Sequence, residues 1–408
     1  MPQTQPVKIE LDVAVVGGGI AGLWLTRRLA ELGYGCALFE AKALGSDQTL
    51  ASQGMIHGGI KYTLAGSLTG ASESVADMPQ YWQDCLNGKG DIDLSDAKTL
   101  SEHFYFWSSD SVSSKMTTFF ASKSVRGRVD KVEPAHYPTL FQDKQFNGQL
   151  YKLQDIVMDT ASVIGALSAP MSDRLFLLPT DYRWVKNENG LAELHFEHAD
   201  HQYIVCAQQF ILCAGKGNGE ILNALGIKKP KMQLRPLQQV WVKHSNPYAF
   251  YGHCLGADST PRLTISSHAS SDGRIVWSLG GSLAEQGVKQ TPAQLIAAAK
   301  KELNDLFPWL DFNVAEWSTS KIDRAEAKQR NFMRPDKAFV APADTVANVM
   351  VGWPTKLTLA PNLANEAVRL LGKKSIQQTA LSALDPLHAL ETPTCGVPPW
   401  ENPENIHA

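Results

Sequence analysis

Three consecutive glycines near the start of the chain separate an apolar run from a helical pattern, in the stretch DVAVVGGGIAGLWLTRRLAELGYGCALFE (12–40). Residues 13–16 are mostly β-branched and predict a short buried strand, which the glycines end at once. After Ile20, leucines at positions 25, 29 and 32 recur at helical spacing until Gly33 ends the pattern. A strand, a glycine turn and a helix are therefore expected in that order.

The glycines have the spacing Gly17-x-Gly19-x-x-Gly22, and a second predicted strand at 36–39 is followed by an acid, Glu40. This is the dinucleotide-binding fingerprint in its required strand–turn–helix context. Gly17 permits the tight turn, Gly19 lets the backbone approach a diphosphate, and Gly22 lets the helix pack closely on the strand. The helix N-terminus offers N–H groups to the diphosphate, and Glu40 would accept hydrogen bonds from an adenosine ribose. The sequence thus predicts a bound adenine dinucleotide, and Glu40 disfavours NADP because a carboxylate repels its 2′-phosphate.

The composition excludes several classes of protein. A net charge of −3, spread along 408 residues, gives no basic footprint for nucleic acid. The 11 histidines and 6 cysteines are scattered, which predicts no metal site and a reduced, cytoplasmic protein. The longest uncharged apolar stretch, at 13–26, is too short for a membrane span, and no targeting segment is recognised.

The order of patterns predicts a nucleotide-binding domain with a second, substrate-binding domain inserted into it. Residues 41–72 are too long and too glycine-rich for an idle connector, because loops of that length usually have a function. Antiparallel hairpins are expected within 236–285 and an amphipathic helix at 292–307. The expected parts are 8–78, 146–233 and 329–384 for the nucleotide domain, 79–145 and 234–328 for the substrate domain, and 385–408 for a proline-rich tail.

Four stretches carry a resemblance to a known superfamily. They are GGGIAG (17–22), SQGMIHGGIKY (52–62), ILCAGKGN (211–218) and TKLTLAPNLANEAV (355–368). Together they resemble the D-amino-acid oxidase/glycerol-3-phosphate dehydrogenase superfamily of FAD-dependent oxidoreductases. SQGMIHGGIKY is similar to the loop that follows the Rossmann unit in the FAD-dependent glycerol-3-phosphate dehydrogenases. The resemblance implies an α/β fold with a Rossmann-like, glutathione-reductase-like FAD-binding domain and an inserted α+β domain built on an antiparallel sheet.

The resemblance also implies FAD rather than NAD as the cofactor. An NAD-linked dehydrogenase is the alternative, against which the turn at 355–361 argues. In such proteins the three glycines hold the diphosphate, Glu40 holds the ribose, and the loop at 52–59 lies against the flavin ring. The remaining residues implied to contact the cofactor are Ser52, Gly54, Gly58, Ala214, Gly215, Thr355, Lys356, Leu357 and Thr358.

The substrate side departs from the superfamily pattern and leaves alternatives open. His57 is a candidate base because histidine titrates in the right range, although it could instead shape its loop or attach FAD covalently. Lys61 is a candidate anion contact, or else a solvated surface lysine. Trp353 either walls the site or packs in the core.

An arginine near the end of the inserted domain is implied to bind the anionic group of the substrate. Arg324 is the first candidate, because a guanidinium fits a carboxylate or phosphate with two hydrogen bonds. The alternative for Arg324 is a structural ion pair with an acid such as Glu326. Arg334 is the second candidate for the clamp, and the sequence does not settle between the two arginines.

The function expected from these motifs is an FAD-dependent dehydrogenase or oxidase. It would act on a small polar substrate, namely a hydroxy acid, an amino acid or a polyol phosphate, by hydride transfer to flavin N5. The alternative from another class is a flavin-binding protein without turnover that serves as a scaffold or partner subunit. Oxygen, a quinone and a partner protein all stay open as the electron acceptor.

Overall fold

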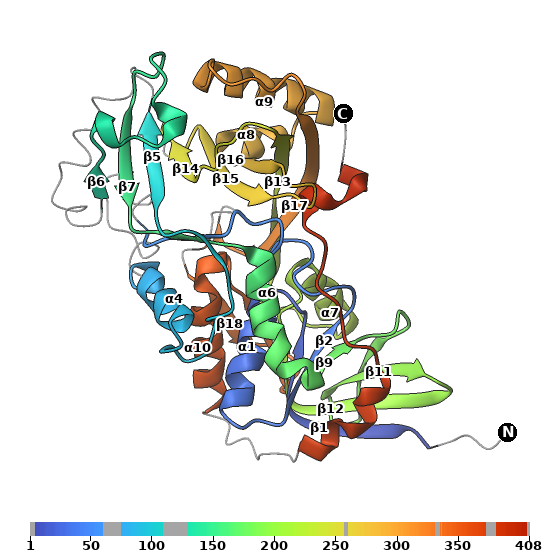
Figure 1. Ribbon diagram of the computed structural model, residues 1–408. Helices are drawn as coiled ribbons and strands as arrows, with labels where there is room; N and C mark the ends of the chain where they lie inside the picture. The colour runs from blue at the N-terminus through green and yellow to red at the C-terminus, as the bar shows by residue number, and fades with distance from the viewer. Residues whose placement is uncertain are drawn as a thin grey trace.

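The computed structural model describes residues 5–59, 75–108, 129–256, 260–330, 335, 337–372 and 381–405. Two large β-sheets dominate it, one in each half of an elongated molecule (Figure 1). The first sheet contains strands from the first and the last expected parts of the nucleotide domain. The second sheet contains the predicted antiparallel hairpins.

The first sheet has a parallel centre. Its parallel strands, in spatial order, are β9 (Leu175–Leu177), β2 (Cys36–Glu40), β1 (Val7–Val16), β12 (His201–Leu212) and β19 (Val349–Trp353). The antiparallel strands β10 (Arg183–Lys186), β11 (Ala192–His198) and β18 (Phe339–Pro342) complete the sheet. Because the parallel strands all end at one edge, the loops that follow them meet there.

Helices cover one face of this sheet. They are α1 (Ile20–Glu31), α4 (Met78–Leu86), α6 (Thr160–Ser168) and α10 (Ala360–Leu371), whose apolar residues share one core cluster with β1. The other face is covered by the β10–β11 hairpin, by α7 (Asn218–Ala224) and by a 3-10 helix at Leu381–Ala389. With helices on one side and a hairpin layer on the other, the parallel strands are buried on both faces.

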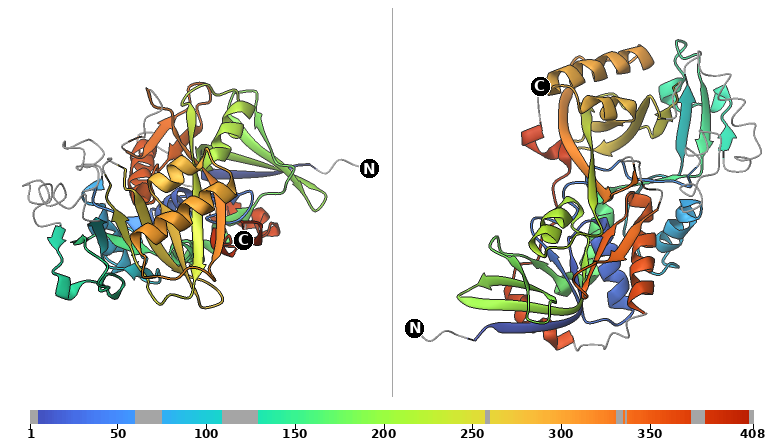
Figure 2. Two further views of the ribbon diagram at one scale, coloured as in Figure 1. Left: turned by 90° about the horizontal axis from the view of Figure 1, so that it is seen from above. Right: turned by 180° about the vertical axis from the view of Figure 1, so that it is seen from behind.

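The second sheet is almost entirely antiparallel. Its strands, in spatial order, are β17 (Glu316–Ala327), β13 (Met232–His244), β16 (Ile275–Gly280), β15 (Leu263–Ala269), β14 (Gly252–Cys254), β5 (Phe104–Ser108), β7 (Gln149–Leu153) and β6 (Val129–Lys131). Only the β14–β5 pair is parallel among the described pairs of this sheet. The expected amphipathic helix is confirmed as α9 (Pro292–Leu306), which begins at a Thr291–Gln294 capping box. Figure 2 shows α9 across the strands, on the side remote from the first sheet.

Smaller elements join the two halves. A short sheet of β3 (Met55–Ile56), β8 (Ile156–Met158) and β4 (Thr99–Ser101) lies between them. Helix α8 (Ser282–Gly287) follows β16 directly.

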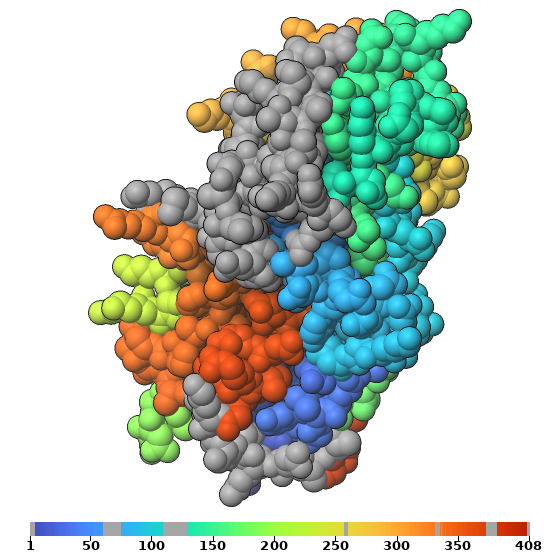
Figure 3. All heavy atoms as spheres, turned by 90° about the vertical axis from the view of Figure 1, so that its left-hand side faces the viewer, coloured from blue at the N-terminus to red at the C-terminus, as the bar shows by residue number. Residues whose placement is uncertain are grey.

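Two segments lie on the other side of the expected domain boundaries. Helix α4, expected in the substrate domain, packs with the first sheet's helices, and the Trp82 ring lies 4.7 Å from that of Trp24 on α1. Figure 3 shows this segment beside α10 on one face of the molecule, where Asn365 donates to the Tyr81 hydroxyl at 3.0 Å. Strand β7, expected in the FAD domain, pairs with β5 instead, and its Leu150 is buried in the second sheet's core.

The proline-rich tail joins the two halves along one side (Figure 1). Cys395 forms an isolated bridge with Leu44, next to the glycine loop. Further along, the Trp400 ring stacks on His268 of β15 at 4.2 Å, and Glu401 accepts hydrogen bonds from Ser270 and Ser271.

Candidate active site

A cavity of about 880 Å³ lies at the edge where the parallel strands end, between the first and second sheets. Residues at or just after the ends of those strands line it, among them Val16, Glu40, Leu178, Cys213 and Trp353. The second sheet and α8 supply the rest of the wall. This is the position at which open α/β sheets bind their ligands.

The glycine loop is shaped as the fingerprint requires. Gly17 has φ +105°, and a Cβ there would lie 2.6 Å from the Ala214 Cα. A Cβ on Gly22 would lie 1.9 Å from the Gly17 carbonyl oxygen, so only glycine lets α1 approach β1 this closely. Gly19 caps α1 and lines the cavity, where its Cβ would meet only Thr49 Oγ1 at 3.4 Å. The backbone at Gly19 can therefore be approached by a diphosphate, while the N–H of Ile20, the first residue of α1, donates to Thr49 Oγ1 at 3.1 Å.

Glu40 ends β2 on the cavity wall and is tied to the glycine loop. Its Oε2 accepts the Gly18 N–H at 2.5 Å, and its Oε1 accepts the Lys42 N–H at 2.8 Å. Both bonds keep the carboxylate at the position where the fingerprint expects an adenosine ribose.

The loop at 52–59 reaches the cavity and packs against residues 155–158. Gly54 has φ +70°, and a Cβ there would lie 2.1 Å from the Met158 carbonyl oxygen. Of the residues expected at the flavin, Ser52, Gly54 and His57 line the cavity, whereas Gly58 does not. Gly58 instead donates its N–H to Asp155 Oδ1 at 2.9 Å.

The turn after β19 packs against this loop. Thr355, Lys356, Leu357 and Thr358 all line the cavity. Thr358 Oγ1 accepts the His57 N–H at 3.4 Å and donates to the Met55 carbonyl at 3.2 Å, while the Thr358 carbonyl accepts the Trp82 indole N–H at 3.1 Å. Helix α10 starts two residues later, so its positive end lies near this turn.

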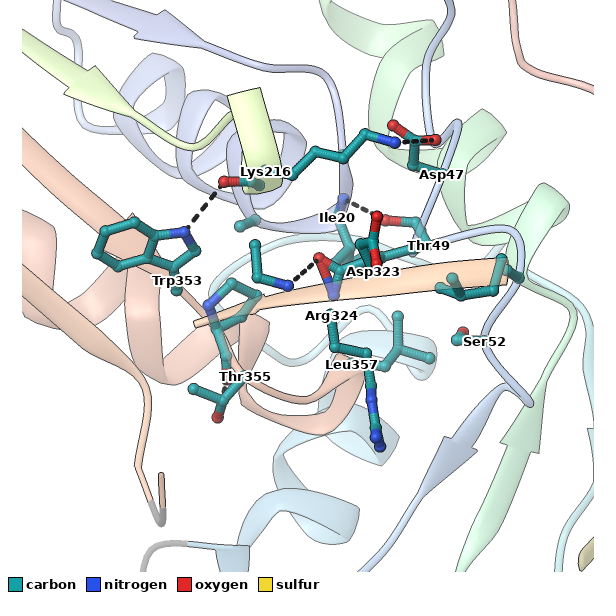
Figure 4. Close-up of a pocket in the computed structure, with 18 of the residues that line it drawn as sticks. Ile20, Asp47, Thr49, Ser52, Lys216, Asp323, Arg324, Trp353, Thr355 and Leu357 are labelled. Atoms are coloured by element: carbon teal, nitrogen blue, oxygen red, sulfur yellow. Dashed lines mark hydrogen bonds and ion pairs between the residues drawn. The ribbon is translucent and has the colours of Figure 1, made fainter. Parts of the chain in front are cut away.

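The turn after β12 also lines the cavity. Ala214 donates its N–H to Asn218 Oδ1 at 2.9 Å, and the Gly215 carbonyl accepts the Trp353 indole N–H at 3.1 Å. Trp353 is fully buried and lines the cavity, so it fills both of the roles considered for it. At this end of the cavity Lys216 Nζ lies 3.2 Å from Asp47 Oδ1, as Figure 4 shows.

Arg324 on β17 also lines the cavity. Its Nε donates to the Arg235 carbonyl at 2.9 Å and its Nη2 to the Pro236 carbonyl at 3.5 Å, which orients the guanidinium plane. Figure 4 shows Arg324 among the residues that line the cavity. The backbone N–H of the next residue, Ala325, donates to Gln48 Oε1 at 3.1 Å.

The acid considered as an ion-pair partner of Arg324 bonds other residues. Glu326 is almost completely buried and accepts from Arg235 Nε at 3.0 Å and from Gln233 at 2.8 Å. Arg324 instead forms an ion pair with Glu285, whose Oε1 lies 3.8 Å from Nη1. Lys61 and Arg334, the other two candidates for an anion contact, lie outside the described residues.

Besides Arg324, the second sheet and α8 bring to the cavity four residues that the sequence did not indicate. His253, Thr264, Gln239 and Glu285 line it, and His253 Nδ1 lies 2.7 Å from Thr264 Oγ1. Each sits in a hairpin or short helix with no motif, so only the pairing of distant strands identifies them.

Comparison with known proteins agrees with this geometry. The family model described as "FAD dependent oxidoreductase" matches residues 12–352, which is most of the chain. The chain is an FAD-dependent oxidoreductase of this family. A probable FAD-dependent oxidoreductase of Pseudomonas aeruginosa is 42% identical over 397 residues, covering 97% of this chain and 99% of that protein. Its crystal structure superposes with a TM-score of 0.81 and 37% identity, over 97% of this chain and 99% of that one.

Other solved structures share the fold at low sequence identity. Glycine oxidase from Geobacillus kaustophilus superposes with a TM-score of 0.65 at 14% identity, over 91% of this chain and 96% of its own. L-α-glycerophosphate oxidase from Mycoplasma pneumoniae, solved with FAD bound, superposes with a TM-score of 0.64 at 14% identity. The match covers 92% of this chain and 98% of that one. This oxidoreductase thus has the expected cofactor, FAD, and the expected fold. Among its described helices, none is long and apolar enough to cross a membrane.

Proposed function

We propose that this FAD-dependent oxidoreductase oxidises a small anionic molecule at the Arg324 end of the cavity. The substrate class is a hydroxy acid, an amino acid or a polyol phosphate. The observation that carries the proposal is that one cavity is lined by residues expected at the cofactor, such as Gly19, Ser52 and Thr355, and also by Arg324. Cofactor and substrate would therefore share one cavity.

The residues on the wall divide into two groups. Gly17, Gly19 and Glu40 would hold the diphosphate and the adenosine ribose, and the N–H groups of residues 355–358 would hold the flavin edge near the positive end of α10. When bound, FAD supplies an acceptor for the hydrogen and both electrons of a substrate C–H bond, while an O–H or N–H proton leaves and a C=O or C=N bond forms.

The chain's own residues would position the substrate and move the proton. Arg324 would bind the anionic group, because its guanidinium plane is already fixed by two strand carbonyls. His57 is buried on the same cavity and is the proposed acceptor of the O–H or N–H proton.

Anaerobic spectroscopy of the purified holoenzyme tests the proposal. The protein is expected to show flavin absorbance, and one member of a panel of amino acids, hydroxy acids and polyol phosphates is expected to bleach it. A flavin that no member of the panel bleaches would contradict turnover of these substrates. The reduced flavin is then exposed to oxygen or to a soluble quinone. Reoxidation by one of them would identify it as the electron acceptor, and reoxidation by neither would indicate a partner protein.

A further inference from the structure

Glu285 brings a carboxylate to the substrate end of the cavity. Its Oε1 lies 3.8 Å from Arg324 Nη1 and 3.9 Å from Arg235 Nη1. Both separations allow ion pairing but are too long for a direct hydrogen bond. The wall near Arg324 therefore carries a positive and a negative group side by side.

The backbone before α8 fixes where this carboxylate lies. Gly281 precedes the helix with φ +78°, and a Cβ there would lie 2.6 Å from the Pro261 carbonyl oxygen. Gly280, Gly281, Ala284 and Glu285 all line the cavity. A glycine-dependent turn thus starts α8 at the cavity wall and turns its fourth residue toward Arg324.

The neighbouring charges are matched without Glu285. Arg235 makes two contacts with the Glu326 carboxylate, at 3.0 and 3.4 Å, and Glu326 is 1% exposed. Since a buried carboxylate needs a partner, Arg235 and Glu326 neutralise each other. The Glu285 carboxylate is then placed to act together with Arg324 on a bound molecule.

The charges beside Arg324 do not favour a dianionic substrate, because the Glu285 carboxylate lies 3.8 Å from its Nη1. A phosphate bound by Arg324 would bring its two negative charges close to Glu285. Like charges at that separation repel each other.

We propose that Glu285 determines substrate specificity, by forming with Arg324 a cation–anion subsite for a zwitterion. The substrate carboxylate binds Arg324 and the substrate ammonium group binds Glu285, which selects an amino acid over a hydroxy acid or a polyol phosphate. This inference rests on the proposed function, because it names the substrate class of the same site.

Two ligands test it that differ only in whether an ammonium group or a hydroxyl is attached to the carbon next to the carboxylate. They are 2-aminoisobutyrate and 2-hydroxyisobutyrate, neither of which has a hydrogen on the carbon next to the carboxylate. Their binding to the holoenzyme is measured by titration calorimetry and by the change in the flavin spectrum. The wild-type protein is expected to bind the amino ligand at least about tenfold more tightly, since a hydrogen bond between charged groups is lost with the hydroxyl.

The substitution Glu285→Gln keeps the shape of the side chain and removes its charge. It is expected to abolish the tenfold preference. The affinity for 2-aminoisobutyrate should fall, and the affinity for 2-hydroxyisobutyrate should stay the same or rise. Glu302→Gln is the matched control, because Glu302 of α9 pairs with Arg262 and does not line the cavity. That variant is expected to keep the wild-type preference.

The outcomes separate this inference from the proposed function. If no substrate of the panel bleaches the flavin, the proposed function fails. If a hydroxy acid or a polyol phosphate bleaches it faster than every amino acid, turnover stands and the zwitterion subsite is wrong. A wild-type protein that does not bind 2-aminoisobutyrate, or a Glu285→Gln variant with an unchanged preference, overturns the inference as well.

Discussion

The Glu40 carboxylate accepts the Gly18 backbone N–H at 2.5 Å, and this bond links the end of β2 to the loop that would hold the diphosphate. Glu40→Ala removes this bond together with the proposed ribose contact. FAD affinity is therefore expected to fall by about 1–3 kcal/mol, the scale of a hydrogen bond to a charged group. Titration of the apoprotein with FAD measures it.

Glu40→Gln is the companion variant, because an amide oxygen can still accept the Gly18 N–H. It is expected to keep more of the FAD affinity than Glu40→Ala. Glu31→Ala, at the end of α1 and paired with Arg27, is the control. Unchanged affinity in Glu40→Ala would show that the adenosine end lies elsewhere.

Arg324→Ala is expected to lower kcat/KM for the substrate by roughly 30-fold to several thousand-fold, as when a desolvated charge partner is removed at a cost of about 2–5 kcal/mol. Arg324→Lys should recover only part, because an ammonium group cannot form two parallel hydrogen bonds. Steady-state kinetics on the substrate that bleaches the flavin measure both.

Flavin content is expected to stay constant in these variants, and the lost bonds to the Arg235 and Pro236 carbonyls should destabilise the fold by only about 1 kcal/mol. Arg262→Ala, which disrupts a pair outside the cavity, should leave kcat/KM unchanged. Loss of FAD or unfolding in Arg324→Ala would show a structural role instead.

Two glycine substitutions in helices should act in opposite directions. Gly22→Ala places a methyl group 1.9 Å from the Gly17 carbonyl oxygen, so α1 must move and both stability and FAD binding should fall, by about 1–3 kcal/mol in unfolding free energy. Gly165→Ala, in the exposed part of α6, meets no atom within 4 Å and should stabilise the protein by about 0.5–1 kcal/mol. Urea unfolding of the two variants compares them directly.

Burial lowers the pKa of His244 to about 4, because its ring packs against Trp277 and Phe312 in the second sheet's core. In the unfolded chain the pKa is about 6.5, so the unfolded state binds the proton more readily. The stability that neutral His244 contributes is complete above pH 6.5 and is lost as the pH falls toward 4. At pH 5 the loss is about 2 kcal/mol relative to pH 7.

Denaturant unfolding at pH 7 and pH 5 measures this loss. His244→Phe should shrink the difference between the two pH values, whereas His136→Asn, at an exposed position, should not change it. An identical pH dependence in His244→Phe and in the wild type would assign the acid sensitivity to other groups.

Features that depend on residues close together in the chain could be predicted from the sequence. The turn between β1 and α1 follows from sterically required glycines at 17 and 22, and α9 follows from its amphipathic period and its capping box. These elements form for local reasons, since caps, turns and helical faces involve neighbours within a few positions. The superfamily motifs are also short stretches of neighbouring residues, and they predicted FAD as the cofactor and the fold.

Features that join distant segments emerged only from the folded chain. The packing of Trp82 on Trp24 places α4 with the first sheet, and pairing with β5 places β7 in the second. The surroundings of Arg324 depend on the fold in the same way. Register places Arg324 opposite Arg235, and α8 brings Glu285 to it, whereas Glu326 pairs with Arg235. No periodicity encodes such contacts, because they depend on how two sheets and a helix pack rather than on the spacing of residues along the chain.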